Sequence, residues 1–245
     1  MRLIRAKNYD DMSLKAANII AAQVSLNPKS VLGLATGSTP IGTYRHLVEW
    51  YQKGELDFGK AVSINLDEYC GLSGEHPQSY RRFMRENLFN HINIPADRSF
   101  LPDGTQTDSA LECARYDRII AEHDGIDLQL LGIGRNAHIG FNEPDSCFAC
   151  GTHQVTLTES TIAANTRFFE NEAQVPRQAY SMGMQAIMQA KRVLLIASGA
   201  DKAEAIRNSF FGPVTPQVPA SILQLHRDVI VIADEAALAD CPAEA

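Results

Sequence analysis

The sequence lacks several features that would place it in a specialised class of protein. It has no run of about 18 apolar residues, so we expect no membrane-spanning helix and no membrane partner. Its first residues, MRLIRAKNYDD, lack the apolar core and cleavage site of a secretion signal. It also has no internal repeat, low-complexity tract or linker rich in Pro, Gly and Ser. These absences favour a single domain over residues 1–245.

Cysteine and positive charge are also scarce. The five cysteines are scattered along the chain, and an odd set of this kind predicts reduced thiols in the cytoplasm. Lys and Arg number 22 against 29 Asp and Glu, which gives a net charge of −7. A field of this sign disfavours nucleic acid as a partner, so an anionic ligand must be held by a local cluster of donors. Hydrophobic residues make up 45% of the chain, enough for a sizeable core.

Apolar runs alternate with amphipathic stretches along the whole chain. The predicted strands are residues 31–35, 61–66, 126–133, 192–197 and 229–233, and the predicted helices are residues 12–24, 41–52, 76–89, 108–123 and 201–210. Asp10 or Asp11 is expected to cap the first helix, and Pro77 is expected at an early position of the third. Near-continuous apolar strands are typical of sheets buried on both faces. The sequence therefore predicts an α/β protein with a doubly wound, mostly parallel sheet and helices on both faces.

Unusual polar residues follow the carboxyl ends of these strands. They are the TGSTP segment at residues 36–40, Asp67, the loop at residues 134–143 and Lys202. Ligands of doubly wound sheets bind at this edge, so we expect these groups to meet there. The least regular segment, residues 136–178, is predicted to contain a mobile lid over the site.

The TGSTP segment lies between a predicted strand and a predicted helix. Gly37 permits a tight turn, and Ser38 and Thr39 add hydroxyl donors beside the free amides of a helix N-terminus. This arrangement suits a phosphate group, although an ordinary turn with a helix cap explains the same residues. The P-loop lysine is absent, which disfavours a nucleoside triphosphate.

Two adjacent carboxylates, Asp67 and Glu68, come directly after an apolar strand. Neighbouring residues of an extended chain point to opposite faces, so we expect one carboxylate in the cleft and the other in solvent or structure. A desolvated carboxylate is a suitable general base for taking a proton from carbon. The alternative is an acid that caps a helix or orders a loop.

The densest motif, GRNAHIGFNEP at residues 134–144, places His138 and Glu143 on one loop. A carboxylate partner fixes the tautomer of an imidazole and raises its basicity. Such an imidazole can move a proton between a sugar ring oxygen and an anomeric hydroxyl. The alternative is a structural histidine bonded to the backbone. A zinc site has less support, because neither HExxH nor paired ligand spacing is present.

Three further features have both a functional and an ordinary interpretation. Arg167 and Lys202 are candidate phosphate partners, although a single residue of either type is more often a solvated surface charge. Cys147-x-x-Cys150, with His153 beyond it, is only a weak signal for metal or redox chemistry, because a fourth ligand is missing. The phenylalanines are expected to pack in the core.

At these motifs the chain resembles the glucosamine-6-phosphate deaminase family. The resemblance spans nearly the whole chain and rests on five motifs in order: LATGSTP from Leu34, NLDEY from Asn65, HPQSY from His76, GRNAHIGFNEP from Gly134 and NTRFF from Asn165. It implies a Rossmann-like fold, and conversion of glucosamine 6-phosphate and water to fructose 6-phosphate and ammonia, with no metal or organic cofactor. We accordingly expect a cytoplasmic enzyme of the hydrolase class with an amino sugar phosphate as its substrate.

The same resemblance implies roles for individual residues. Asp67 resembles the family's base that moves a proton between C2 and C1, His138 the acid/base that opens the sugar ring, and Glu143 its carboxylate partner. The implied phosphate site consists of Gly37, Ser38, Thr39, Arg167 and Lys202. Some family members have Asp where this chain has Asn136, so we expect Asn136 to orient its neighbours rather than to carry a proton.

The resemblance also bears on assembly and leaves alternatives open. Family members activated by N-acetylglucosamine 6-phosphate have a longer C-terminus and basic residues after FNEP, whereas residues 145–156 contain no Lys or Arg. We therefore expect no such regulation, and a monomer or a small homo-oligomer. One alternative is a 6-phosphogluconolactonase-like hydrolase, against which NLDEY and FNEP argue. The other is a sugar-phosphate sensor without turnover, which usually carries a DNA-binding segment that this chain lacks.

Overall fold

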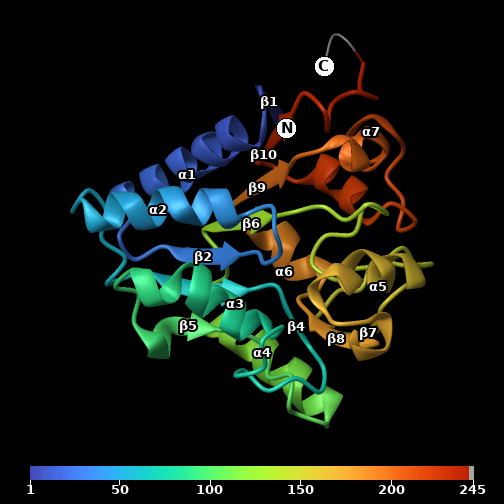
Figure 1. Cartoon of the computed structure of the whole chain (residues 1–245), viewed down its shortest axis with the longest axis horizontal. Coiled ribbons are helices and arrows are strands. Elements are labelled where there is room, and N and C mark those ends of the chain that lie inside the picture. The colour runs from blue at the N-terminus through green and yellow to red at the C-terminus, as the bar shows by residue number, and fades with distance from the viewer. Residues whose placement is uncertain (243–245) are drawn as a thin grey trace.

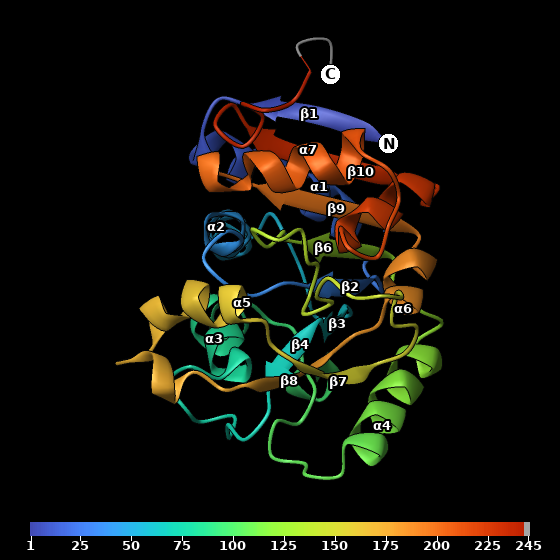
Figure 2. The same cartoon turned by 90° about the vertical axis from the view of Figure 1, so that its right-hand side faces the viewer.

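The computed structural model describes residues 1–242 and contains a seven-stranded sheet. Its strands lie in the order β1 (Arg2–Ala6), β10 (Val229–Asp234), β9 (Arg192–Ala197), β6 (Leu128–Leu131), β2 (Val31–Leu34), β3 (Val62–Asn65) and β5 (Ser99–Phe100). Every neighbouring pair is parallel. Figure 2 shows the strands stacked one above another from β1 to β3. The predicted parallel sheet is confirmed.

Helices cover both faces of this sheet. They are α1 (Tyr9–Leu26), α2 (Ile41–Gln52), α3 (Tyr80–Asn87), α4 (Ser109–Glu122), α5 (Glu159–Asn165), α6 (Met184–Gln189) and α7 (Ala203–Phe211). Short 3-10 turns are η1 (Phe89–His91), η2 (Ala96–Arg98), η3 (Thr166–Phe168), η4 (Glu172–Gln174), η5 (Ala200–Lys202) and η6 (Pro219–Leu225). In Figure 2, α7 lies on the near side of β9 and β10 and α1 on the far side. None of the helices in residues 1–242 is both long and apolar enough to cross a membrane.

The core forms where apolar strands meet the inner faces of helices. All six residues of β10 are buried, as are five of the six residues of β9, so these strands have no solvated face. Helix α1, which packs along α2 (Figure 1), turns Met12, Ala16, Ile20 and Val24 inward at helical spacing. Full burial of one such large apolar side chain contributes about 2 kcal/mol to folding. The apolar patterning therefore explains the main layers.

Two helix starts differ from the prediction. Asn8, rather than Asp10 or Asp11, caps α1, because its side chain accepts a hydrogen bond from the Asp11 amide at 3.0 Å. The two aspartates lie in the first turn, where their charge favours the positive end of the helix dipole. Helix α3 begins at Tyr80, so Pro77 lies in the turn that precedes it.

A small antiparallel sheet is the main feature that the sequence pattern did not predict. Its strands lie in the order β4 (Asp67–Tyr69), β8 (Gln178–Ser181) and β7 (His153–Thr156). Only Leu66 separates β3 from β4, so the chain leaves the large sheet immediately before Asp67. This change of sheet places Asp67 at the carboxyl edge of the parallel strands.

The connection between β7 and β8, residues 157–177, is called the cap below. It contains α5, η3 and η4, and Figure 1 shows it at the side of the molecule away from α1. An apolar cluster joins it to the small sheet: Tyr69, Phe141, Leu157, Ile162, Val175 and Ala179. The cap lies within the segment 136–178 in which a lid was predicted.

Candidate active site

A cavity of about 560 Å³ opens at the carboxyl ends of β9, β6, β2 and β3, which are neighbours in the large sheet. Eight of the nine predicted site residues line it: Gly37, Ser38, Thr39, Asp67, Asn136, His138, Arg167 and Lys202. Glu143 lies behind the cavity wall, against His138. The volume suits a small-molecule ligand. The expectation that distant parts of the chain meet at this edge is confirmed.

Asp67 lies in the cavity wall with only 6% of its surface exposed. Burial, together with the charge of Glu68, raises the pKa of Asp67 to about 8. No residue within 1–242 donates a hydrogen bond to its carboxylate. A desolvated carboxylate that accepts no hydrogen bond is a stronger base than a solvated one. Asp67 is therefore suited to proton abstraction.

Glu68 points the other way and fixes the start of helix α3. Its carboxylate accepts hydrogen bonds from the Ser79 hydroxyl at 2.9 Å and from the amides of Tyr80 and Arg81 at 2.9 and 3.0 Å. These amides belong to the first turn of α3, whose donors have no partner within the helix. The prediction of one carboxylate in the cleft and one in the structure is therefore confirmed.

His138 and Glu143 form a pair on the loop after β6. The Nδ1 atom of His138 lies 3.4 Å from Oε2 of Glu143 and 3.5 Å from the Thr161 hydroxyl of the cap. Asn136 donates a hydrogen bond to the same Glu143 oxygen at 2.6 Å. Burial opposes ionisation of Glu143, but His138, Thr161 and Asn136 together lower its pKa to about 2. Glu143 is therefore ionised at neutral pH and holds the imidazole by Nδ1, which leaves Nε2 for proton transfer.

The backbone of this loop brings the imidazole close to the sheet. At Gly134, a Cβ would lie 2.4 Å from the His138 ring, so only glycine fits there. Ala137 adopts a φ of 65°, which costs an L-residue about 1–2 kcal/mol. Gly140 has a φ of 58°, and a Cβ there would lie 3.6 Å from Oδ2 of Asp67. The loop therefore brings its backbone close to Asp67 while it carries His138.

Cationic groups gather where the loops after β2 and β9 meet the cap. Arg167 of the cap donates a hydrogen bond to the Ser38 hydroxyl at 3.3 Å. Burial lowers the pKa of Lys202, and Arg135 and Arg167 act in the same direction against the attraction of Asp201. The predicted phosphate-binding residues thus come together, joined by the hydroxyl and amide groups that follow β2.

Aromatic rings lie around Asp67, and of these only the phenylalanines were predicted, as core residues. Tyr69 and Tyr80 have ring centroids 4.8 Å apart, and Tyr80 and Phe141 have centroids 6.0 Å apart. All three line the cavity, and Phe169 of the cap packs edge-on against Tyr69 at 5.9 Å. The rings keep water away from Asp67. The HPQSY motif, which contains Tyr80, was the available signal.

The Cys147-x-x-Cys150 motif gains no support as a metal or redox centre. Both cysteines are free and exposed, and the neighbouring His153 interacts through Nδ1 with the Gly151 carbonyl at 3.1 Å. In the part of the chain that the structure describes, no group of three or more His, Cys, Asp or Glu side chains is placed to hold a metal ion.

The sheet and the cavity define a protein of the Rossmann-like class whose cleft brings acid–base groups together with a cluster of cations. More particularly, the chain belongs to the family described as glucosamine-6-phosphate isomerases/6-phosphogluconolactonase, whose model matches residues 6–232. A glucosamine-6-phosphate deaminase of Lachnoclostridium phytofermentans is 61% identical over 95% of this chain and 98% of its own length. One from Clostridioides difficile is 56% identical over 97% of this chain and 95% of its own length.

Solved structures agree with the family. One described as a monomeric glucosamine-6-phosphate deaminase matches with a TM-score of 0.96 and 44% identity, and covers 98% of this chain and 100% of that one. The 6-phosphogluconolactonase of Leishmania guyanensis matches with a TM-score of 0.78 over 99% of both chains, at 20% identity. The second likeness shows the fold alone. The predicted Rossmann-like fold and family are both confirmed.

Proposed function

We propose that this chain converts glucosamine 6-phosphate and water into fructose 6-phosphate and ammonia. The observation that carries the proposal is the environment of Asp67, a buried carboxylate with a raised pKa that shares one cavity with His138 and a cluster of cations. A base of this kind suits a carbon acid, and the cations suit the phosphate. Relatives named glucosamine-6-phosphate deaminase, 52–61% identical over nearly the whole chain, support the same reaction.

In the proposed mechanism, His138 first opens the sugar ring. Its Nε2 takes the proton of the anomeric hydroxyl and returns a proton to the ring oxygen, which yields the open-chain aldehyde. Glu143 stabilises the imidazolium that forms between these two transfers, and Asn136 holds the Glu143 carboxylate in place. Asn136 thus orients a neighbour without carrying a proton.

Asp67 then moves a proton between two adjacent carbons. It removes the hydrogen from C2, next to the aldehyde, and an enolamine forms. The protonated Asp67 returns the proton to C1, which leaves an imine at C2. Water adds to C2, the carbon–nitrogen bond breaks, and ammonia departs as the ketone of fructose 6-phosphate forms. The aromatic rings around Asp67 favour this step because they limit exchange of the carried proton with water.

The proposed reaction is of the isomerase type, and the hydrolase class expected above has no support. Its defining step shifts a proton between C2 and C1 and turns an aldose into a ketose. Water enters only to release the amine. The family description names isomerases, and the relatives are named deaminases.

At the other end of the cavity, the phosphate group is proposed to bind among Ser38, Arg167 and Lys202. Gly37 contributes a turn with a φ of 89°, and Thr39 adds a second hydroxyl. Arginine forms paired hydrogen bonds with phosphate oxygens, and lysine acts as a point charge. These contacts place the sugar carbons toward Asp67.

The test is turnover of glucosamine 6-phosphate without added metal, with ammonia and fructose 6-phosphate measured in equal amounts. Free glucosamine serves as the matched substrate without phosphate and should react far more slowly. Faster hydrolysis of 6-phosphogluconolactone than turnover of the amino sugar would favour the lactonase alternative. Tight binding of the amino sugar phosphate without any product would favour the sensor alternative.

We propose that residues 1–245 act as one catalytic domain, that the cap closes over the bound substrate, and that the chain works as a monomer. The similar structure described as monomeric supports this state, which sedimentation would test. The five free cysteines support the cytoplasm as its location. The expected lack of activation by N-acetylglucosamine 6-phosphate, and of nucleic-acid or membrane partners, stays a prediction.

A further inference from the structure

The cavity contains a third cation that the predicted phosphate site omits. Arg135 lies on the loop after β6 and lines the cavity together with Arg167 and Lys202. Its Nε atom lies 2.9 Å from Oδ2 of Asp201, and Nζ of Lys202 lies 3.9 Å from the same oxygen. One carboxylate therefore links two cations that come from different loops.

We propose that Arg135 binds the phosphate group of the substrate, and that Asp201 sets the charge of the phosphate site by bridging Arg135 and Lys202. The inference rests on the proposed function and specifies its phosphate site. The proposal assigns a specificity role to Arg135, which follows Gly134 on the loop that also carries His138 and Glu143.

The charges at this end of the cavity match those of a phosphate dianion. Arg135, Arg167 and Lys202 supply three positive charges and Asp201 supplies one negative charge, which leaves a net charge of two positive units. A phosphate monoester at pH 7 carries a charge of about −2. Asp201 also opposes the effect of the two arginines on the ionisation of Lys202, so it helps to keep the ammonium group charged.

The guanidinium group of Arg135 keeps free donors for this purpose. Its Nε atom donates a hydrogen bond to Asp201, whereas within residues 1–242 neither terminal nitrogen has a hydrogen-bond partner. Two parallel N–H groups are the donor arrangement that grips two phosphate oxygens. The ion pair itself is half-exposed, with 60% and 42% of the two side chains accessible, so it contributes little to stability. Replacement of Arg135 should therefore leave the fold intact.

Arg135→Ala tests the phosphate contact. We expect the KM for glucosamine 6-phosphate to rise about tenfold, because a charge-assisted hydrogen bond is lost, while kcat stays within about twofold, because the phosphate is bound equally in ground and transition states. The inhibition constant of inorganic phosphate should rise by a similar factor, and turnover of free glucosamine should not change. Unchanged KM and inhibition constant would overturn the proposal.

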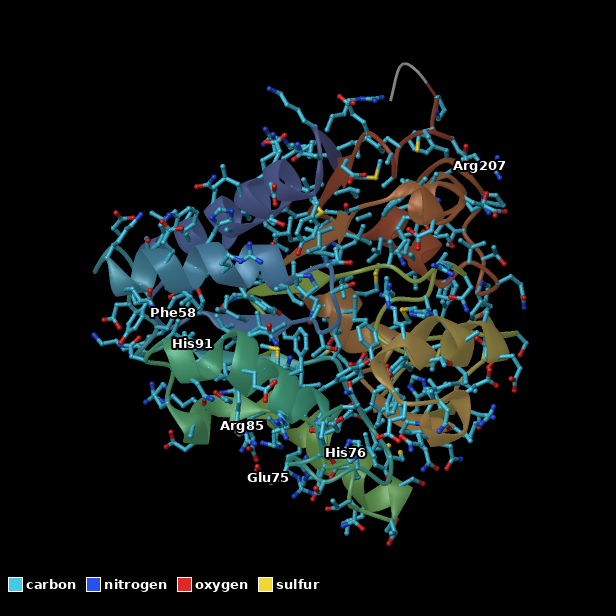
Figure 3. The ribbon with its side chains drawn as sticks, in the orientation of Figure 1. Phe58, Glu75, His76, Arg85, His91 and Arg207 are labelled. Carbon is cyan, nitrogen blue, oxygen red and sulfur yellow. The ribbon has the colours of Figure 1, made fainter. Side chains whose placement is uncertain are left out.

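Arg207→Ala is the matched control. Arg207 is an exposed arginine at the outer edge of α7 (Figure 3), lies 4.0 Å from Glu204, and is not part of the cavity wall. Its replacement removes the same charge from the whole chain, so it should leave the KM and the inhibition constant unchanged. An equal loss in both variants would mean that net charge, not a phosphate contact, controls binding, and would overturn the proposal.

Asp201→Asn separates a phosphate site from a purely structural ion pair. Asn keeps an acceptor for Arg135 but removes the negative charge, so inorganic phosphate should inhibit at lower concentration than in the wild type, opposite to Arg135→Ala. Changes in the same direction in both variants would overturn the proposal. If the wild type does not turn over glucosamine 6-phosphate, the proposed function fails. Binding of inorganic phosphate to wild type and Arg135→Ala, measured by calorimetry, then still decides the role of Arg135.

Discussion

Replacement of Asp67 by Asn removes a titrating carboxylate from the cavity and keeps its size. In the folded chain, burial and the charge of Glu68 raise the pKa of Asp67 from 3.8 to about 8, so the folded state holds this proton more tightly than the unfolded state does. A group whose pKa is higher in the folded state than in the unfolded state stabilises the fold. This contribution is complete at a pH below the pKa of the unfolded state, and it is lost as the pH rises to the pKa of the folded state. We therefore expect the free energy of unfolding of the wild type to fall, relative to that of Asp67→Asn, as the pH rises from about 4 to about 8.

The size of the effect follows from the difference between the two pKa values. Each pKa unit corresponds to 1.36 kcal/mol, so a shift of about four units amounts to about 5 kcal/mol in the free energy of unfolding. Relative to the variant, the wild type should lose about 1.4 kcal/mol per pH unit between about pH 4 and 8, and nothing further above that range. The slope is informative because a constant difference in packing between Asp and Asn does not affect it.

Urea unfolding of both proteins from about pH 5 to 9, followed by circular dichroism, measures this slope. The same variant should still bind glucosamine 6-phosphate but lose exchange of the C2 hydrogen with deuterated water. A stability difference that is independent of pH would refute the raised pKa of Asp67. Normal exchange in the variant would mean that a different group is the base.

Three further substitutions examine the groups around Asp67 and the phosphate site. Glu68→Gln should lower the free energy of unfolding by about 2 kcal/mol in urea, because the amide nitrogen that replaces one carboxylate oxygen cannot accept the hydrogen bonds of the Ser79 hydroxyl and the Arg81 amide. It should also move the acid limb of kcat/KM to lower pH, since the charge that raises the pKa of Asp67 is gone. An unmoved limb would contradict that coupling. Glu143→Gln should lower kcat about 100-fold with little change in KM in steady-state assays, and near-normal kcat would argue against the ring-opening relay. Lys202→Ala should raise the KM for glucosamine 6-phosphate about tenfold and leave turnover of free glucosamine unchanged. Lys191 is an exposed lysine paired with an aspartate, and Lys191→Ala should change neither quantity. Equal losses for both sugars in Lys202→Ala would count against phosphate binding.

Five of the seven strands of the large sheet are predictable because each lies in a near-continuous apolar run. Strand β1, which contains two arginines, and strand β5, which has two residues, were not predicted, and neither was the order of the strands. Helix α2 and strand β9 have the bounds that the pattern gives. The strands of the small sheet are four residues long or shorter and mix polar with apolar residues, so pairing with one another, rather than local sequence, forms them. The start of α3 was misplaced for a similar reason, because the carboxylate of Glu68 that fixes it is distant in the sequence.

The site was predictable as a set of residues but not as a geometry. Spacing alone indicated that Asp67 and Glu68 diverge, and only the resemblance to a family indicated which of them enters the cavity. Arg135 was overlooked because a loop arginine beside a glycine has the pattern of an ordinary surface charge, and its partner Asp201 lies 66 residues away. The ring of Tyr80 against Tyr69 depends in the same way on β4 and α3 meeting in space.

The attachment of the cap has a consequence for how such a protein can diversify. Both ends of residues 157–177 are fixed in one sheet, where Val155 of β7 faces Ala179 of β8, and β8 in turn pairs Ser181 with Asp67. An exchange of this stretch between homologues would thus replace a cassette between two adjacent strands and leave the proton-transferring aspartate on its native support. The contact that Arg167 makes from the cap could thereby vary between homologues without moving Asp67.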